Sequence, residues 1–160
     1  MEWDKITDII LIASFGVLAV LGILGLYQWV TRKSIKKVDR ALLAMFVPLA
    51  LMAAVYLFFD KVWIVNTRPN GSGEASFPST HTMVVATIFL CTVFLLPKYI
   101  KQKALYIALD ILMFGLITLT ALGRVFSNMH WPTDVAAGLI FAAVFAVIYF
   151  VIAKERKKNE

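Results

Sequence analysis

Five long apolar runs, separated by short polar connections, constrain what this chain can fold into. The runs span residues 6–30, 41–59, 78–96, 104–122 and 135–153. Each approaches the 20 or so residues that an α-helix needs to cross about 30 Å of hydrocarbon. Only 16% of the residues are charged, compared with about a quarter in ordinary soluble domains. The sequence therefore predicts an all-α integral membrane bundle of five transmembrane helices.

The chain shows no internal boundary at which it would divide. No linker, low-complexity tract or repeat separates the runs, so residues 1–160 are expected to form a single transmembrane domain. The first run is not expected to be a cleavable signal, because Glu2 and Asp4 precede its apolar part, which is also too long. Cys91 is the only cysteine, which excludes an intrachain disulfide.

Basic residues concentrate in three of the segments outside the apolar runs. They are Arg32, Lys33, Lys36, Lys37 and Arg40, then Lys98, Lys101 and Lys103, and finally Lys154, Arg156, Lys157 and Lys158. A five-helix path places all three clusters on one side, and basic connections stay cytoplasmic. We therefore expect the N-terminus outside and the C-terminus in the cytoplasm of a plasma membrane. This grouping also argues against nucleic acid as a partner, despite a net charge of +6.

Small residues recur at every fourth position in the last run, at Gly138, Ala142 and Ala146. Such a stripe allows a neighbouring helix to approach closely. We expect it to be a packing face and not a catalytic one.

The two connections on the opposite side contain three short polar motifs, at residues 61–69, 78–81 and 123–134. Together they offer three cations, two histidines and a carboxylate. These groups can hold a phosphoryl group and transfer it through a histidine. Because all three motifs fall on one face, the topology supports a common site.

The first motif contains Lys61 and Arg68, seven residues apart, with Pro69 directly after the arginine. A guanidinium matches two phosphate oxygens, whereas an ammonium acts as a compact point charge. The pair therefore suits a phosphate group. A basic pair near anionic headgroups is the alternative interpretation.

The second motif, Pro78-Ser79-Thr80-His81, opens the third apolar run. Proline favours the first helical turn, where free backbone N–H groups attract anions. Ser79 could add a hydroxyl donor, and His81 could protonate a leaving oxygen. A histidine that only caps the helix or lies at the interface is the alternative.

The third motif contains Arg124, His130 and Asp134, and Pro132 indicates a helix start between the last two. Asp134 is expected to accept a hydrogen bond from one imidazole nitrogen of His130, which leaves the other nitrogen to attack phosphorus. Alternatively, Asp134 is a favourable charge in the first helical turn. That alternative leaves His130 and Arg124 unexplained.

In this order the motifs resemble the signature of the type 2 phosphatidic acid phosphatase superfamily, KxxxxxxRP, PSGH and SRxxxxxHxxxD. The matching residues are Lys61, Arg68 and Pro69, then Pro78, Ser79 and His81, then Arg124, His130 and Asp134. The resemblance covers the chain from about Lys61 to the end of the last run. Thr80 replaces the glycine of the second motif, and Gly123 replaces the serine of the third.

The resemblance implies a role for each of these residues. His130 would be the nucleophile that forms a phosphohistidine, oriented by Asp134, and His81 would protonate the leaving group and then activate water. The groups expected to bind the phosphoryl oxygens are Lys61, Arg68, Ser79, Thr80 and Arg124, with nearby backbone amides. No metal or other cofactor is implied.

The family commonly has six crossing helices, whereas this chain offers five. The missing helix would precede the first motif. Its absence could leave one side open to membrane lipids, or a second subunit could fill the gap in a homodimer.

The sequence therefore predicts a membrane lipid phosphatase. It would act on phosphatidic acid, phosphatidylglycerol phosphate or undecaprenyl diphosphate at the outer interface. A catalytically silent protein that binds or transports lipid phosphates is the alternative. Asp110, inside the fourth run, is the one residue that would favour transport, but we expect it to have a structural role, at the interface or with a Thr or Ser partner. A related vanadate haloperoxidase is disfavoured, because those proteins are soluble.

Overall fold

The computed structural model describes residues 2–154, and five helices within this range are long and apolar enough to cross a membrane. Four of them are continuous: α1 (Glu2–Arg32), α4 (Thr80–Tyr99), α5 (Lys103–Phe126) and α6 (Pro132–Ala153). The other span comprises α2 (Arg40–Ala44), α3 (Phe46–Leu57) and the π-helical turn η2 (Phe58–Val62), and a short 3₁₀-helix, η1 (Ile35–Lys37), precedes it. The predicted all-α bundle of five spans is confirmed.

The third span begins later than the sequence predicted. Pro78 does not form the first helical turn, because Ser79 has an extended backbone and the helix begins at Thr80. The peptide bond between Phe77 and Pro78 is cis. The second motif therefore lies at the junction between a connection and α4.

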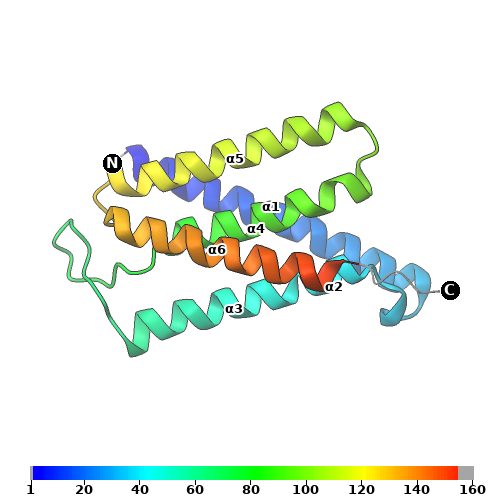
Figure 1. Ribbon diagram of the computed structural model, residues 1–160, viewed down its shortest axis with the longest axis horizontal. Helices are drawn as coiled ribbons and strands as arrows, with labels where there is room; N and C mark the ends of the chain where they lie inside the picture. Colours follow the sequence, from blue (N-terminus) through cyan, green and yellow to red (C-terminus); the bar gives the residue numbers. More distant parts are fainter. Residues whose placement is uncertain (1, 155–160) are drawn as a thin grey trace.

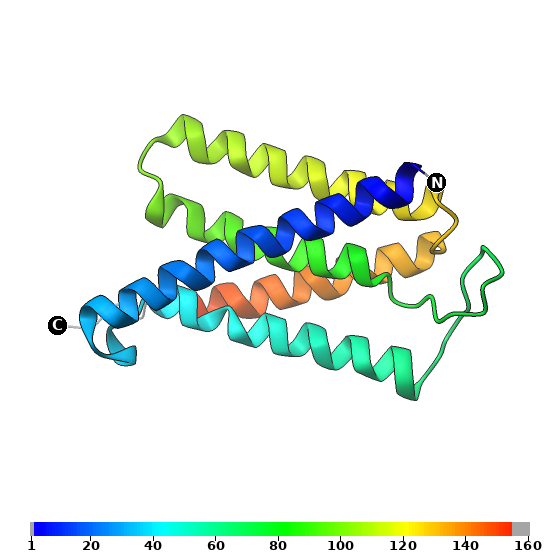
Figure 2. The ribbon, with the colours of Figure 1, turned by 180° about the vertical axis from the view of Figure 1, so that it is seen from behind.

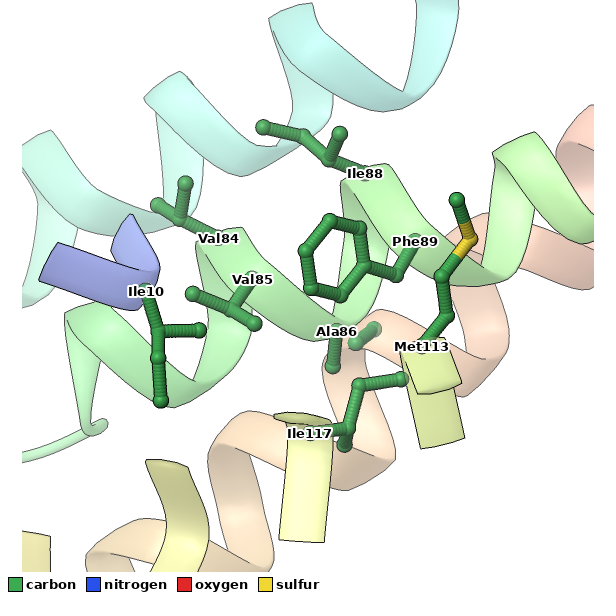
Figure 3. Packing of buried hydrophobic residues seen from close by; sticks show 9 residues of the cluster. Ile10, Val84, Val85, Ala86, Ile88, Phe89, Met113 and Ile117 are labelled. Carbon is green, nitrogen blue, oxygen red and sulfur yellow. The ribbon is translucent and has the colours of Figure 1, made fainter. Parts of the chain in front are cut away.

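Helix α4 forms the centre of the bundle and packs against α1, α3, α5 and α6 (Figure 1). Its side chains are buried on most of its circumference, as expected for a helix that is apolar on every side. Val85 and Phe89 of α4 pack with Ile10 of α1 and with Met113 and Ile117 of α5 (Figure 3). This cluster holds both α1 and α5 against α4, and α1 and α5 also contact each other.

The contact between α4 and α6 depends on the absence of a side chain at Gly138. A Cβ atom there would lie 2.9 Å from the carbonyl oxygen of Ser79, closer than real Cβ contacts come. Ala142 and Ala146 continue the same buried face. The predicted packing stripe is confirmed, and it positions the beginning of α4 against α6.

The two ends of the bundle carry different residues. The N-terminus, the connection 63–79 and the turn between α5 and α6 share one end (Figures 1 and 2). The basic connections 33–39 and 100–102 lie at the other end, together with Lys154. Arg156, Lys157 and Lys158 lie outside the described residues. All three polar motifs therefore meet at the end opposite to the basic connections.

Candidate active site

The connection 63–79 folds back on itself above the start of α6. Gly71 and Gly73 have φ angles of 76° and 74°, which glycine adopts without steric cost, so the chain reverses there. Beyond the turn, the amide of Ser76 donates to the carbonyl oxygen of Asn66 at 2.9 Å. This pairing places the Asn66 and Ser76 side chains beside Asp134.

Asp134 is fully buried and organises these segments. Its carboxylate accepts hydrogen bonds from Asn66 Nδ2 at 2.9 Å, from the backbone amide of Trp131 at 2.9 Å and from the Ser76 hydroxyl. Its backbone carbonyl oxygen accepts from the amide of Ser79 at 3.0 Å. Asp134, a residue of the third motif, therefore joins the connection 63–79 to the beginning of α4.

His130 is buried, and its hydrogen bond differs from the predicted one. Its Nδ1 donates to the carbonyl oxygen of Ser76 at 2.8 Å, whereas Asp134 Oδ2 lies 4.0 Å away. The predicted direct bond from His130 to Asp134 is therefore absent, because other donors surround the carboxylate and the carbonyl of Ser76 lies closer to the ring. A carbonyl oxygen only accepts, so Nδ1 carries the proton and Nε2 keeps a lone pair.

The surroundings keep the His130 ring neutral. Burial and the positive charge of Arg124, with a further contribution from Arg68, lower the pKa of His130 to about 4. The hydrogen bond to Ser76 and the charge of Asp134 offset only part of this effect. At neutral pH, His130 therefore has the protonation state that a nitrogen nucleophile needs.

Arg124 lies in the last turn of α5, with its side chain 3% exposed. Its Nη1 donates to Asp4 Oδ1 at 2.6 Å and to Thr7 Oγ1 at 3.2 Å, both on α1. Its Nε is buried and has no hydrogen-bond partner among the described residues. The guanidinium is thus held by α1 on one side and retains an unused donor.

His81, in the first turn of α4, is paired with α1 as well. Its Nε2 lies 2.8 Å from Asp8 Oδ1, and that oxygen lies 4.0 Å from Arg124 Nη1. Asp4 and Asp8, one helical turn apart, therefore serve the second and third motifs. These two acids were not predicted as site residues from the sequence. Two carboxylates near the end of an apolar helix were the available signal, since such groups are costly there without partners.

The two cations of the first motif are in different surroundings. Arg68 Nη1 forms an ion pair with Glu74 at 2.8 Å, and its Nε is buried without a partner among the described residues. Lys61 Nζ pairs with the adjacent Asp60 at 2.7 Å, and its side chain is 72% exposed. The structure therefore brings Arg68 close enough for its charge to act on His130, whereas the contact recorded for Lys61 is with Asp60.

Ser79 and Thr80 differ in how much of their polar surface is available. Ser79 is fully buried, and its hydroxyl shares a hydrogen bond of 3.0 Å with Thr82 Oγ1. Thr80 is half-buried and is the first residue of α4, where backbone amides are not yet used by the helix. The N-terminal backbone of α4 therefore offers more donors than the Ser79 hydroxyl.

Gly123, which departs from the expected motif, lies at a close contact between α5 and α1. A Cβ atom at this position would be 2.6 Å from Thr7 Cγ2 and 3.5 Å from Trp3 Cε3. A serine would therefore displace α1 from the site. The structure offers no corresponding explanation for Thr80.

Comparisons with known proteins agree with this arrangement. A sequence model of the PAP2 superfamily matches residues 58–158. The fold is similar to a crystal structure of a transmembrane PAP2 type phosphatidylglycerolphosphate phosphatase from Bacillus subtilis. Its TM-score is 0.69, with 22% sequence identity over 99% of this chain and 78% of that chain. A search of curated proteins finds no significant match. The predicted resemblance is confirmed, and the five spans belong to a multi-pass membrane protein. Helix α1, with Asp4 and Asp8, lies outside residues 58–158, which the family model matches, although the structural similarity covers 99% of the chain.

Proposed function

The chain belongs to the PAP2 superfamily and is a membrane phosphatase, and we propose that it hydrolyses the phosphate or diphosphate end of a membrane lipid through a phosphohistidine on His130. One observation carries this proposal. The buried ring of His130 is neutral, its Nδ1 proton is held by Ser76, and its Nε2 has a lone pair. The charges of Arg124 and Arg68 act on the same ring, which supports a place for a phosphoryl group beside it.

Two displacements at phosphorus complete the proposed reaction. In the first, His130 Nε2 bonds to phosphorus, the bond from phosphorus to the leaving oxygen breaks, and His81 gives that oxygen a proton. In the second, His81 takes a proton from water, whose oxygen bonds to phosphorus while the nitrogen–phosphorus bond breaks. Phosphate is released and both histidines return to their starting states.

Binding of the phosphoryl oxygens is assigned to Arg68, Arg124 and the first backbone amides of α4. Both guanidinium groups have a buried Nε without a partner among the described residues, and a phosphoryl oxygen would satisfy such a donor. Thr80 belongs to this region through its backbone amide. The amide of Ser79 already donates to the carbonyl oxygen of Asp134, so Ser79 would contribute its hydroxyl. Lys61 is proposed to bind at the edge, after leaving Asp60. Asp134 acts through Ser76 and Asn66, which it holds.

The substrate is proposed to be an amphiphile. An open depression of about 490 Å³ at this end is lined by Ile64, Val65, Asn66, Thr67 and Trp131. Its apolar residues are exposed beside the polar groups of the site, which suits a phosphate attached to a lipid tail. The candidates are phosphatidic acid, phosphatidylglycerol phosphate and undecaprenyl diphosphate. The name of the Bacillus subtilis protein makes phosphatidylglycerol phosphate the first to test.

The site is proposed to face the outside of a plasma membrane, because the basic connections occupy the other end of the bundle and such connections stay cytoplasmic.

A homodimer also stays a prediction. An apolar groove of about 520 Å³ between α1 and the α2–α3 segment includes Gly25, Leu42 and Phe46, and a helix of another subunit could cover it. The mass of the active protein–detergent particle tests this, and a monomeric mass would contradict it.

Phosphate release by purified protein in detergent tests the proposed function. The three lipids are assayed with EDTA present, and His130→Gln is the matched variant. We expect release that continues in EDTA and is lost in the variant, together with an acid-labile, base-stable ³²P label on the wild-type protein. Binding without any release would favour the silent binding or transport protein instead.

A further inference from the structure

The carboxylate of Asp8 and the imidazole of His81 form a pair that the family motifs do not include. Asp8 lies on α1, outside the residues matched to the family, and its Oδ1 is 2.8 Å from His81 Nε2. The two side chains are 52% and 22% exposed. An exposed ion pair of this kind contributes only about 0–1 kcal/mol to stability. Stability alone therefore gives little reason for an acid at this position in an apolar helix.

We propose that Asp8 is a positioning residue for His81, which holds the ring so that its other nitrogen delivers a proton to the leaving oxygen. This inference rests on the function proposed above. With Nε2 directed to Asp8, Nδ1 is the nitrogen left for the reaction. Asp8 thereby sets the orientation of the acid without touching the substrate.

The charges around His81 support this division of roles. Asp8 Oδ1 is the carboxylate oxygen that lies 2.8 Å from Nε2 of the His81 ring. Asp4 is engaged by Arg124 at 2.6 Å, whereas Asp8 Oδ1 is 4.0 Å from that guanidinium. Asp8 is thus the carboxylate available to the histidine, and a carboxylate at hydrogen-bond distance stabilises a protonated imidazole.

The proposed step conserves protons. Before attack, the His81 imidazolium donates Nε2–H to Asp8 and Nδ1–H toward the leaving oxygen. As the bond from phosphorus to oxygen breaks, the Nδ1 proton moves to that oxygen, and the neutral ring keeps its Nε2–H bond to Asp8. In the second displacement Nδ1 accepts the proton of the attacking water, which restores the imidazolium.

Two substrates with different leaving groups separate this role from a structural one. A phosphatidic acid leaving group needs a proton, whereas the nitrophenolate of p-nitrophenyl phosphate leaves as a stable anion. Asp8→Asn removes the charge and keeps the side-chain shape. We expect kcat on phosphatidic acid to fall roughly 10- to 100-fold, a part of the 10²- to 10⁴-fold that acid catalysis supplies. The rate with the aryl substrate should change much less, and Asp8→Glu should recover part of the loss.

Asp4→Asn is the matched control, one helical turn away on α1. It acts through Arg124, so it should weaken both substrates to a similar degree. An equal loss on both substrates in Asp8→Asn, or no loss on either, would overturn the proposal. A gain in kcat/KM would also overturn it, because it would mean that Asp8 competes with the substrate phosphate.

Two histidine variants keep the two proposals distinguishable. His81→Gln should reproduce the selective loss of Asp8→Asn, and His130→Gln should lose both activities. Full activity in His130→Gln would refute the proposed function itself. If His130→Gln is inactive while Asp8→Asn equals the wild type on phosphatidic acid, only the role of Asp8 is refuted. Thermal unfolding in detergent confirms that each variant is folded.

Discussion

The Nδ1 atom of His130 lies 2.8 Å from the backbone carbonyl oxygen of Ser76, and this contact fixes the tautomer of the proposed nucleophile. A carbonyl oxygen has no proton to lose or gain near neutral pH, so the orientation of the ring does not depend on the charge of Asp134. Asp134 contributes by accepting bonds from the Ser76 hydroxyl, Asn66 and Trp131. Its effect on the orientation of the His130 ring therefore passes through the connection 63–79.

This arrangement predicts an intermediate effect for Asp134→Asn. The amide accepts fewer bonds than the carboxylate, so buried donors lose partners and the protein should lose roughly 1–3 kcal/mol of stability. We expect turnover to fall about 10- to 100-fold, less than the ~10⁴-fold loss known when a histidine loses the acid that fixes its tautomer. Ser76→Ala keeps the carbonyl and should cost less than tenfold. A larger loss in Asp134→Asn with unchanged unfolding temperature would indicate direct contact between Asp134 and His130.

The protonation of His130 can be observed directly, since the chain has only two histidines. NMR of histidine-labelled protein in micelles should show one ring that stays neutral, with the proton on Nδ1, down to about pH 4. The His81→Gln variant retains only the signal of His130 and thereby assigns it. A titration midpoint near the ordinary value of 6.5 would contradict the buried, arginine-flanked environment.

The same lowered pKa has a consequence for stability. Between about pH 6.5 and pH 4 the unfolded chain protonates His130 while the folded protein does not. Stability should therefore be complete above pH 6.5 and decrease as the pH falls toward 4. Unfolding followed at several pH values, with His130→Gln as control, measures this contribution. An equal pH dependence in the two proteins would show that His130 is not its source.

The features that could be predicted from the sequence are those encoded over short distances. Apolar runs are sufficient to identify membrane helices, and the spacing from His130 to Asp134 places both at the start of α6. Contacts between distant segments were not predictable in this way. Asp8 meets His81 only after α1 packs against α4, and Asp4 meets Arg124 only after α1 packs against α5. The acceptor for His130 is a backbone carbonyl, which no residue type can signal.

Restoring the expected serine at position 123 should be harmful in this protein. The new Cβ of Gly123→Ser would lie 2.6 Å from Thr7 Cγ2, and overpacking of this kind costs roughly 1–3 kcal/mol. Because Thr7 also contacts Arg124, we expect turnover to fall together with the unfolding temperature.

Thr7→Ser provides the compensating change, since it removes the methyl group and keeps the hydroxyl. The double variant should regain most of the stability and activity lost in Gly123→Ser. If the second change restores nothing, the close contact between α1 and α5 is not the reason for glycine at position 123.

Asp110 distinguishes a hydrolase from a transporter, because an acid within a membrane helix often belongs to a proton path. Its Oδ1 is buried in α5 and has no hydrogen-bond partner among the described residues, an arrangement that costs free energy. At the other end of α5, Arg124 is held by α1, and the proposed reaction includes no step that uses Asp110.

We therefore expect Asp110→Asn to keep phosphate release within about twofold, and Asp110→Leu to raise stability by roughly 1–2 kcal/mol. Steady-state turnover and thermal unfolding in detergent measure both effects. Loss of turnover in a normally folded Asp110→Asn protein would give this carboxyl a functional role and would strengthen the transport interpretation.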